Sequence, residues 1–397
     1  MSILPKPSTL HRWPIFRLRI TRLLVLILLI CISLYQYNRR YSSSAREAPK
    51  HEITSADIEF AVAHVPNRTN ASLHHGFLPL ADAEELCARQ SWQPWLKRDG
   101  RRKVYSLFMI NDELDMLEVH LSTLYGYVDY FVIVESPVTF TNLQKPLILK
   151  DNWARIEKWS DKVIHHVLEN PPIGAPRPWD YEDFQRNAMF LQTFPKMVGE
   201  KEPKKGDVII VTDVDEIMRP AAVMLLRECE TKRRMTLRNQ FYYYSFQWRH
   251  VGPQWELPKA TTFGGFGNDE TILPADLRNG EGGNRLAWLW EKDELWNAGW
   301  HCSTCFGSVE EVLRKMDSFS HQGLNQGFFR DPTRIVDRVR KGLDLWDREG
   351  QKYARIHPNE DIPEILKADR ERWKYMLDRD AANAEFRDVE LENIPGE

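Results

Sequence analysis

Apolar runs and amphipathic segments alternate between residues 104 and 211 of the 397-residue chain. Four mainly apolar stretches, rich in β-branched residues, predict strands over residues 104–110, 130–136, 162–168 and 208–211. Leucines recur at helical spacing over residues 114–124, and a second helix is predicted over residues 181–194. Alternating faces over residues 234–250 predict one or two longer strands. This order of elements predicts an α/β fold with a doubly wound, Rossmann-like mixed sheet.

The N-terminal region carries a different apolar signal, because residues 22–37 form a run of roughly fifteen apolar residues, near the lower limit for crossing a bilayer. Basic residues precede this run, namely Lys6, Arg12, Arg17, Arg19 and Arg22. Their charge places the N-terminus in the cytoplasm and predicts an uncleaved, single-pass type II anchor. A cleaved signal peptide is the alternative, but no small-x-small site follows Ser33. A short anchor suits the thinner membranes of the secretory pathway, and we expect a Golgi membrane protein with a lumenal domain.

The polar composition after the anchor predicts a stem that ends where the buried strands begin. We therefore divide the chain into a cytoplasmic tail, an anchor, a lumenal stem, a globular domain and a polar C-terminal tail, over residues 1–21, 22–37, 38–100, 101–378 and 379–397 respectively. Glycosylation sequons at Asn67 and Asn70 lie in the predicted stem, in agreement with a lumenal orientation.

Charge and cysteine content narrow the function further. The net charge of -3 gives no support to nucleic-acid binding through a broad basic surface. Cys87, Cys229, Cys302 and Cys305 leave an even number of cysteines outside the anchor, so disulfides are expected, with three possible pairings. A zinc site formed by His301, Cys302 and Cys305 is a weaker alternative, because no fourth ligand has the required spacing.

An acidic cluster follows the strand predicted over residues 208–211. Asp213, Asp215 and Glu216 arrive within four positions in the stretch "GDVIIVTDVDEIMRP". Carboxylates this close repel one another, so a bound cation explains them better than burial alone, although a solvated acidic turn is also possible. An Asp-x-Asp at a strand end suits Mn²⁺ or Mg²⁺ holding the diphosphate of a nucleotide sugar.

Longer stretches resemble glycosyltransferase family 17. They are "NDELDMLEVHLSTLYGYVDYFVIVESPVTFTNLQKPL", "DVDEIMRP", "NAGWHCSTCF" and the region from "SFSHQGLN" to "GLDLW", in consistent order between residues 101 and 377. The resemblance implies a GT-A-like fold and a divalent metal. It also implies an inverting transfer of N-acetylglucosamine from UDP-N-acetylglucosamine to a mannose of an N-glycan, in β-1,4 linkage.

The resemblance also assigns roles to individual positions. Asp213 and Asp215 are expected to contact the metal, and Glu216 to orient them or the sugar. Arg186, in "YEDFQRN", is expected to meet the diphosphate through its bidentate guanidinium. A buried ion pair is the structural alternative for Arg186.

Residues at the ends of the earlier strands are expected to face the uridine, namely Asn111, Asp112 and Glu135; Glu135 could instead be a buried ion-pair partner. His301 and His321 are both candidates for a further metal ligand from the C-terminal half. Each could equally be a hydrogen-bonded core histidine.

The general base that an inverting transfer needs is left unassigned. Glu281, Asp269 and Glu270 lie in glycine-bearing segments, and no spacing selects among them. Four tryptophans could stack on sugars or simply fill a core, namely Trp288, Trp290, Trp296 and Trp300.

Two other functional classes fit part of the pattern. The stretch "VIIVTDVDEI" also resembles the first motif of haloacid-dehalogenase-type phosphatases, although the Lys and acidic pair that such enzymes need downstream are not evident. A non-catalytic, glycan-binding lumenal protein with the same fold is the third possibility.

Overall fold

The computed structural model describes residues 24–33, 49–65, 78–97, 102–172, 177–267, 270–282 and 287–390. The chain divides into two compact units, Met1–Pro49 and Lys50–Glu397. In the first unit, residues 24–33 form a helix whose apolar side chains are largely exposed. None of the helices in the described ranges combines the length and apolar character that crossing a membrane requires. The predicted cytoplasmic tail, both ends of the predicted anchor and the sequons at Asn67 and Asn70 lie outside the described residues.

The second unit is built on a single mixed sheet, to which ten strands contribute among the described residues. The strands are β1 Val104–Ile110, β2 Tyr130–Glu135, β3 Val163–Val167, β4 Val208–Val211, β5 Glu216–Met218, β6 Arg234–Tyr243, β7 Ser245–His250, β8 Lys259–Thr262, β9 Lys292–Ser303 and β10 Tyr353–Arg355. The four strands predicted from apolar runs are β1 to β4. The alternating stretch forms β6 and β7, which are separated at Tyr244 by a positive φ of 67°.

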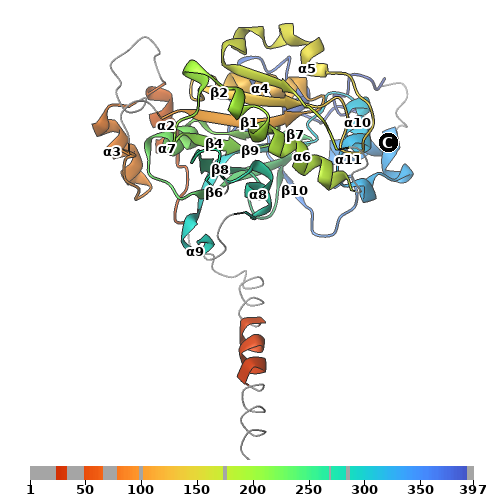
Figure 1. Cartoon of the computed structure of the whole chain (residues 1–397). Coiled ribbons are helices and arrows are strands. Elements are labelled where there is room, and N and C mark those ends of the chain that lie inside the picture. Colours follow the sequence, from red (N-terminus) through yellow and green to blue (C-terminus); the bar gives the residue numbers. More distant parts are fainter. Residues whose placement is uncertain are drawn as a thin grey trace, which may run out of the picture. The chain divides into compact units, whose positions relative to one another are not determined.

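The parallel half of the sheet has the order β3-β2-β1-β4. This is the strand order of one half of a doubly wound fold, in which ligands gather at the carboxyl ends of the strands. Strands β8, β6, β7 and β10 continue the sheet with antiparallel pairing, and β9 joins β6 to β5 (Figure 1). The predicted mixed α/β sheet is therefore confirmed.

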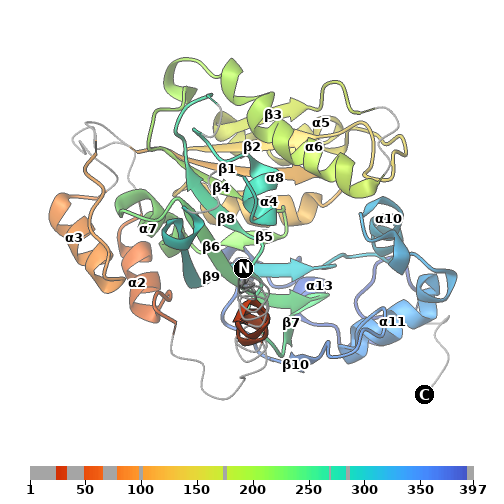
Figure 2. The same ribbon diagram turned by 60° about the horizontal axis from the view of Figure 1, so that its bottom comes forward.

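Helices cover the sheet and its ends. The α-helices are α2 Ser55–Ala63, α3 Leu80–Arg89, α4 Leu114–Leu124, α5 Ile148–Asp151, α6 Pro178–Leu191, α7 Pro220–Glu228, α8 Pro274–Asn279, α9 Trp288–Glu291, α10 Val309–Ser318, α11 Pro332–Lys341, α12 Glu364–Ala368 and α13 Lys374–Leu377. Short 3₁₀ turns are η1 Trp153–Arg155, η2 Glu157–Lys162, η3 Phe194–Lys196, η4 Gly199–Lys201, η5 Gln322–Leu324 and η6 Gly327–Arg330. Figure 2 shows α2, α3 and α7 at one end of the sheet and α10 and α11 at the other.

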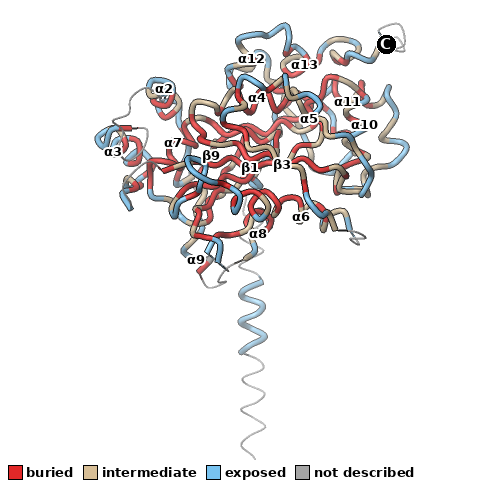
Figure 3. The backbone as a smooth tube through the Cα atoms, turned by 45° about the horizontal axis from the view of Figure 1, so that its top comes forward, coloured by how far each residue is buried: buried red, intermediate tan, exposed pale blue. Residues whose placement is uncertain are grey.

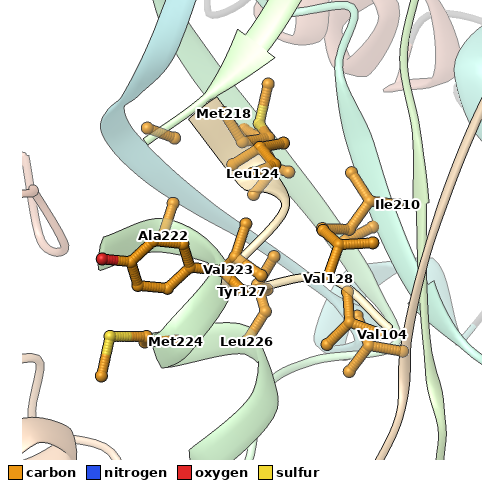
Figure 4. Packing of buried hydrophobic residues seen from close by; sticks show 14 of the residues in the cluster. Val104, Leu124, Tyr127, Val128, Ile210, Met218, Ala222, Val223, Met224 and Leu226 are labelled. Atoms are coloured by element: carbon orange, nitrogen blue, oxygen red, sulfur yellow. The ribbon is translucent and has the colours of Figure 1, made fainter. Parts of the chain in front are cut away.

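Alternate residues of the central strand β1 bury against opposite helical layers. Val104, Phe108 and Ile110 join a core that contains α4 and α7 residues, and part of this core is shown in Figure 4. Tyr105 and Leu107 instead join a core that contains residues of α6 and α8. Each fully buried side chain of this size contributes about 2 kcal/mol of hydrophobic stabilisation. In Figure 3 the tube is red along β1, which marks it as buried. The buried centre of the sheet is thus a rigid base for the loops at its carboxyl edge.

Part of the predicted stem belongs to the folded body. Helices α2 and α3 lie within residues 38–100, and their side chains enter the same buried core as α7. Cys87 of α3 forms a disulfide with Cys229, which follows α7, across a sequence separation of 142 residues. The α2 and α3 segments are short and have polar residues between their apolar positions, so no sequence pattern indicates this packing.

The predicted polar tail also differs from the structure up to residue 390. Arg379 is fully buried and donates to the carbonyl oxygens of Tyr244, Phe306 and Ala384, and Phe386 is buried too. A single arginine that satisfies three carbonyl groups explains how so polar a segment is held in the core. Residues 391–397 lie outside the described residues.

Candidate functional site

A cavity of about 560 Å³ opens at the carboxyl edge of the parallel strands. Asn111 follows β1, Asp213 and Asp215 follow β4, and Arg186 reaches the cavity from α6. Residues of β6, β9, α8 and α10 complete the lining. The cavity has the size and the place in the fold that are typical of ligand sites in doubly wound proteins.

Asp213 is held by two arginines. Its Oδ1 accepts from Arg186 Nη1 at 2.8 Å and its Oδ2 accepts from Arg278 Nη2 at 2.6 Å. Burial alone would raise the pKa of Asp213, but the charges of Arg186 and Arg278 outweigh burial and lower this pKa well below its usual range. Asp213 is therefore ionised, and each of its oxygens accepts from one arginine.

Glu216 is the buried anchor of this network. Its carboxylate is fully buried and accepts from Arg278 Nη1 at 2.5 Å, from Trp255 Nε1 at 2.6 Å and from the Asp213 amide at 2.8 Å. A buried carboxylate with three donors fixes the groups that donate to it. Glu216 thus fixes the positions of the Asp213 backbone and the Arg278 guanidinium.

Asp215 has different partners. Its Oδ1 lies 3.6 Å from His301 Nε2, and its Oδ2 lies 3.5 Å from Lys315 Nζ. Burial raises the pKa of Asp215, but His301 and Lys315 outweigh burial and lower it. The strand pairing explains how His301 arrives there: β5 and β9 pair Glu216 with His301, and the Cys302 amide donates to the Asp215 carbonyl at 3.1 Å.

A buried histidine holds the turn between the two aspartates. His120 of α4 is fully buried, and its Nδ1 lies 3.0 Å from the Val214 carbonyl oxygen. Burial lowers the pKa of His120 to about 4, so the ring is neutral near pH 7 and Nδ1–H donates to this carbonyl. The position of the Asp213–Asp215 turn is therefore fixed from the core side as well.

Asp215 and His301 are the donors that a cation could use. The described residues contain no cluster of three or more His, Cys, Asp or Glu arranged for a metal ion. Asp215 Oδ1 and His301 Nε2 nevertheless face each other at 3.6 Å, close to the separation of about 3 Å between neighbouring ligands of an octahedral ion. Mg²⁺-like ions use one or two protein ligands and complete their shell with phosphate oxygens and water. The pair fits such a shared site, whereas each oxygen of Asp213 already accepts from an arginine.

Positive and negative side chains are nearly balanced in the described lining. The carboxylates are Glu113, Glu182, Asp213 and Asp215, and the cations are Lys145, Arg186, Arg278, Lys315 and Arg348. Glu216 lies beneath the lining and accepts from Arg278. When it is included, the carboxylates and the cations are equal in number. A strongly anionic ligand would therefore need additional positive charge in this cavity, which a bound cation could supply.

Two residues predicted to face a uridine lie elsewhere. Glu135 is fully buried; it accepts from the Leu149 and Lys150 amides at the start of α5 and from His165, and it does not line the cavity. Asp112 accepts from Arg314, and burial raises its pKa to about 7. Both expectations treated a position at a strand end as sufficient, whereas the side chains turn toward neighbouring helices. Of the three residues expected at the uridine, Asn111 lines the cavity.

The remaining expectations divide in the same way. Arg186 lines the cavity but is committed to Asp213 and to Glu182 at 2.8 Å each. His321 lines the cavity, yet its ring contacts are with Trp179 and Phe319. His301 is thus the histidine that accompanies Asp215.

None of the candidate bases and tryptophans whose side chains the structure describes lines the cavity. Asp269 is not among the described residues, and neither Glu270 nor Glu281 lines the cavity. Trp290 and Trp296 do not line it, and Trp300 packs against Arg219 with its indole bonded to Asp361. For Trp288 the structure describes the backbone alone.

Sequence reasoning missed several groups that the fold brings to the cavity. Arg278 lies in the last turn of α8, and Lys315 lies on α10. Lys145 donates to the Asn111 carbonyl at 2.9 Å. Arg278 directly precedes the glycine-bearing segment "NGEGGN", and that neighbourhood was the available signal. No periodicity or spacing could have singled out Lys315 or Lys145.

The pairing of the cysteines excludes the zinc site that was the alternative to disulfides. Cys302 forms a disulfide with Cys305, and Cys87 with Cys229, so two of the predicted disulfides exist and the pairing is fixed. Since the sulfurs of Cys302 and Cys305 are bonded to each other, a zinc site made from them is wrong. The Cys302–Cys305 disulfide instead closes a short loop directly after His301.

Comparison with known proteins gives one extensive match. The sequence model for glycosyltransferase family 17 matches residues 18–264 and 290–381. Two relatives, from Homo sapiens and Rattus norvegicus, each align with 71% of this chain at 25% identity. Both are named beta-1,4-mannosyl-glycoprotein 4-beta-N-acetylglucosaminyltransferase. The chain spans 56% of the length of the human relative and 55% of that of the rat relative.

Solved structures resemble the chain only slightly. The mannosyltransferase PcManGT from Pyrobaculum calidifontis, in complex with GDP-Man and Mn²⁺, aligns with a TM-score of 0.30 at 12% identity, over 72% of this chain and 75% of that one. A mycobacterial protein aligns with a TM-score of 0.29 at 13% identity, over 59% and 72%.

Proposed function

The chain belongs to glycosyltransferase family 17, and from this membership we propose that it transfers N-acetylglucosamine from UDP-N-acetylglucosamine to a mannose of a protein-linked N-glycan. The proposed linkage is β-1,4 with inversion, on a GT-A-like catalytic domain. The activity named for the human and rat relatives supports the donor sugar, the acceptor and the linkage.

One observation carries the proposal. Asp215 and His301 face each other in a cavity of about 560 Å³, at the carboxyl ends of parallel strands, beside a charge-balanced lining. A site of this kind suits an anionic ligand that brings a cation with it. The haloacid-dehalogenase reading is less favoured, because its nucleophile would be Asp213, whose two oxygens are both engaged by arginines.

Asp215 and His301 are the residues that would hold a divalent metal, Mn²⁺ in preference to Mg²⁺ because a nitrogen ligand takes part. When bound, the metal supplies positive charge to the diphosphate of the donor. Asn111 lies at the end of β1, where the uridine is expected, in line with the general placement of nucleotides in doubly wound folds.

Other side chains of the cavity lining act on the donor diphosphate and on the acceptor hydroxyl. Lys145 and Lys315 line the cavity with ammonium groups that can donate to phosphate oxygens. As the mannose hydroxyl bonds to the anomeric carbon and the bond to UDP breaks, negative charge grows on the diphosphate, and these ammonium groups stabilise it. The hydroxyl proton passes to a base; among the described lining carboxylates, Glu113 and Glu182 lie outside the Asp213–Asp215 pair.

The membrane assignment belongs to the proposal as well. Residues 22–37 form the anchor of a single-pass type II protein of the Golgi membrane, with the segment between the anchor and α2 as lumenal stem and the cavity facing the lumen. The support is the apolar run with its preceding basic residues. The disulfides Cys87–Cys229 and Cys302–Cys305 agree with an oxidising compartment.

A transfer assay tests the proposal. The purified full chain is incubated with Mn²⁺, a mannose-terminated N-glycan and each of several UDP-sugars, and the product linkage is read by NMR. We expect N-acetylglucosamine to be transferred in preference to other sugars. Phosphatase activity without transfer, or glycan binding without turnover, would contradict the proposal and favour the other two classes.

A further inference from the structure

One wall of the cavity is a continuous row of aromatic rings. Successive ring centroids in this row lie 4.8 to 6.4 Å apart, within the range of direct aromatic contact. The members of this aromatic row, in spatial order, are Phe241, Tyr243, Trp346, Phe319, His321 and Trp179, and all of them line the cavity. The row is drawn from β6, from the segment after α10, from a loop near residue 346 and from the start of α6, so only the fold assembles it.

The inner end of the aromatic row reaches the proposed reaction centre. Phe241 stacks on His301 with centroids 4.9 Å apart and an interplanar angle of 13°. His301 in turn lies beside Asp215. A ligand that lies along the row therefore ends next to the pair proposed to bind the metal and the donor diphosphate.

The outer end of the row is exposed. Trp179 is 43% exposed, which is unusual for so large an apolar side chain, and His321 is exposed beside it with its ring edge-on at 88°. Phe319 and Trp346 are half-buried, and Tyr243 is buried at 1%. Phe241 at the inner end is half-buried, so the row passes from buried or half-buried rings to two exposed ones, as expected for a binding wall and not for a closed core.

The chemistry of the row favours a neutral ligand with hydroxyl groups. Burial lowers the pKa of His321, so no member of the row is charged near pH 7. The His321 ring nitrogens make no hydrogen bond to the described residues, and a neutral imidazole offers one donor and one acceptor. Ser320 and Gln351 add polar groups to the same part of the lining.

We propose that the aromatic row is the acceptor subsite of this enzyme and binds several sugar rings of an oligosaccharide. Pyranose rings have apolar C–H faces that pack on aromatic rings and hydroxyl edges that bond to groups such as His321. A row of six rings is longer than one sugar, so it favours an oligosaccharide over a monosaccharide. Trp179 and His321 contact the sugar farthest from the reaction centre, and His321 is a specificity residue instead of a metal ligand. The subsite rests on the proposed glycosyl transfer.

The test compares single variants of the full chain. Trp179→Ala removes the exposed platform, Trp179→Phe restores an aromatic face, and His321→Ala removes the free imidazole. Trp290→Ala is the matched control, because Trp290 is 59% exposed and does not line the cavity. Acceptor and donor KM are measured with a mannose-terminated N-glycan oligosaccharide. Saturation-transfer NMR with UDP present reports binding of the same oligosaccharide without turnover, and methyl β-mannoside serves as the one-ring probe.

Trp179→Ala is expected to raise acceptor KM about tenfold and to leave donor KM within about twofold, as an aromatic binding hot spot does. The NMR signals of the outer sugar rings should vanish with it, Trp179→Phe should largely restore them, and Trp290→Ala should match the original chain. An unchanged acceptor KM and an unchanged NMR spectrum in Trp179→Ala would overturn the subsite, even if transfer occurs. If no sugar is transferred but the NMR signals depend on Trp179, the proposed function fails while the subsite stands.

Discussion

Replacing Glu216 with alanine tests the polar network beneath the site. The fully buried carboxylate accepts from Arg278, from the Trp255 indole and from the Asp213 amide. Its removal leaves three buried donors short of an acceptor. Arg278 keeps one partner, because Asp213 Oδ2 still lies 2.6 Å from Nη2.

The expected loss of stability follows from these contacts. Removing one partner of a buried ion pair costs about 3 to 5 kcal/mol, and the retained Asp213 contact places this pair at the lower end. The unpaired indole N–H adds about 1 kcal/mol. We therefore expect Glu216→Ala to lower the free energy of unfolding by about 4 kcal/mol. At about 2 °C per kcal/mol, Tm should fall by about 8 °C.

Thermal unfolding followed by near-UV circular dichroism measures this loss. The control is Glu360→Ala, whose carboxylate lies 3.0 Å from Arg370 but is 68% exposed, so that its removal should leave Tm almost unchanged. If Glu216→Ala unfolds at the same temperature as Glu360→Ala, the buried network does not support the Asp213 turn in the way described.

Three further predictions concern the aspartate turn and the disulfide. Asp215→Asn should reduce turnover by about a hundredfold or more in the transfer assay while Tm stays near that of the original chain, and a variant that keeps its activity would remove Asp215 from the site. Burial lowers the pKa of His120 from 6.5 to about 4, so the unfolded chain takes up this proton first; the stability that the neutral ring confers is complete above pH 6.5 and should fall by about 3 kcal/mol as pH drops toward 4. His120→Asn keeps a donor for Val214 and should flatten this part of the pH profile in urea unfolding, whereas an identical pH profile would refute the assignment. Cys87→Ser should cost about 4 to 5 kcal/mol, because the disulfide closes a loop with a separation of 142 residues, and an unchanged urea midpoint would show that α3 needs no covalent link.

Much of the fold could be predicted because β1, β2 and β4 are almost entirely buried. An unbroken apolar run has one stable placement, inside a parallel sheet, and it leaves a clear pattern in sequence. Helices α2 and α3 lacked such a pattern, since their attachment depends on the Cys87–Cys229 disulfide and on packing against α7, both distant in sequence. The C-terminal segment was read as a tail because its anchor, Arg379, is a charged residue that the structure buries against carbonyl groups.

The site was predictable only where one short segment carries it. The acidic cluster lies together both in sequence and in the structure; its members are Asp213, Asp215 and Glu216. Its clustered charge indicates the position of the cavity. Glu135 was misplaced because a strand end fixes where a backbone stops and not where its side chain turns. The aromatic row comes from four separate segments, so no local pattern could reveal it.

The most direct test of the account is the dependence of sugar transfer on the Asp215–His301 pair. The full chain and its Asp215→Asn, His301→Ala and Glu360→Gln variants are assayed with UDP-N-acetylglucosamine and a mannose-terminated N-glycan over a Mn²⁺ titration. We expect turnover in the original chain and in Glu360→Gln, and a loss in the first two variants with a raised Mn²⁺ requirement in His301→Ala. Equal turnover and equal Mn²⁺ dependence in all four proteins would contradict the claim that this pair forms the reaction centre.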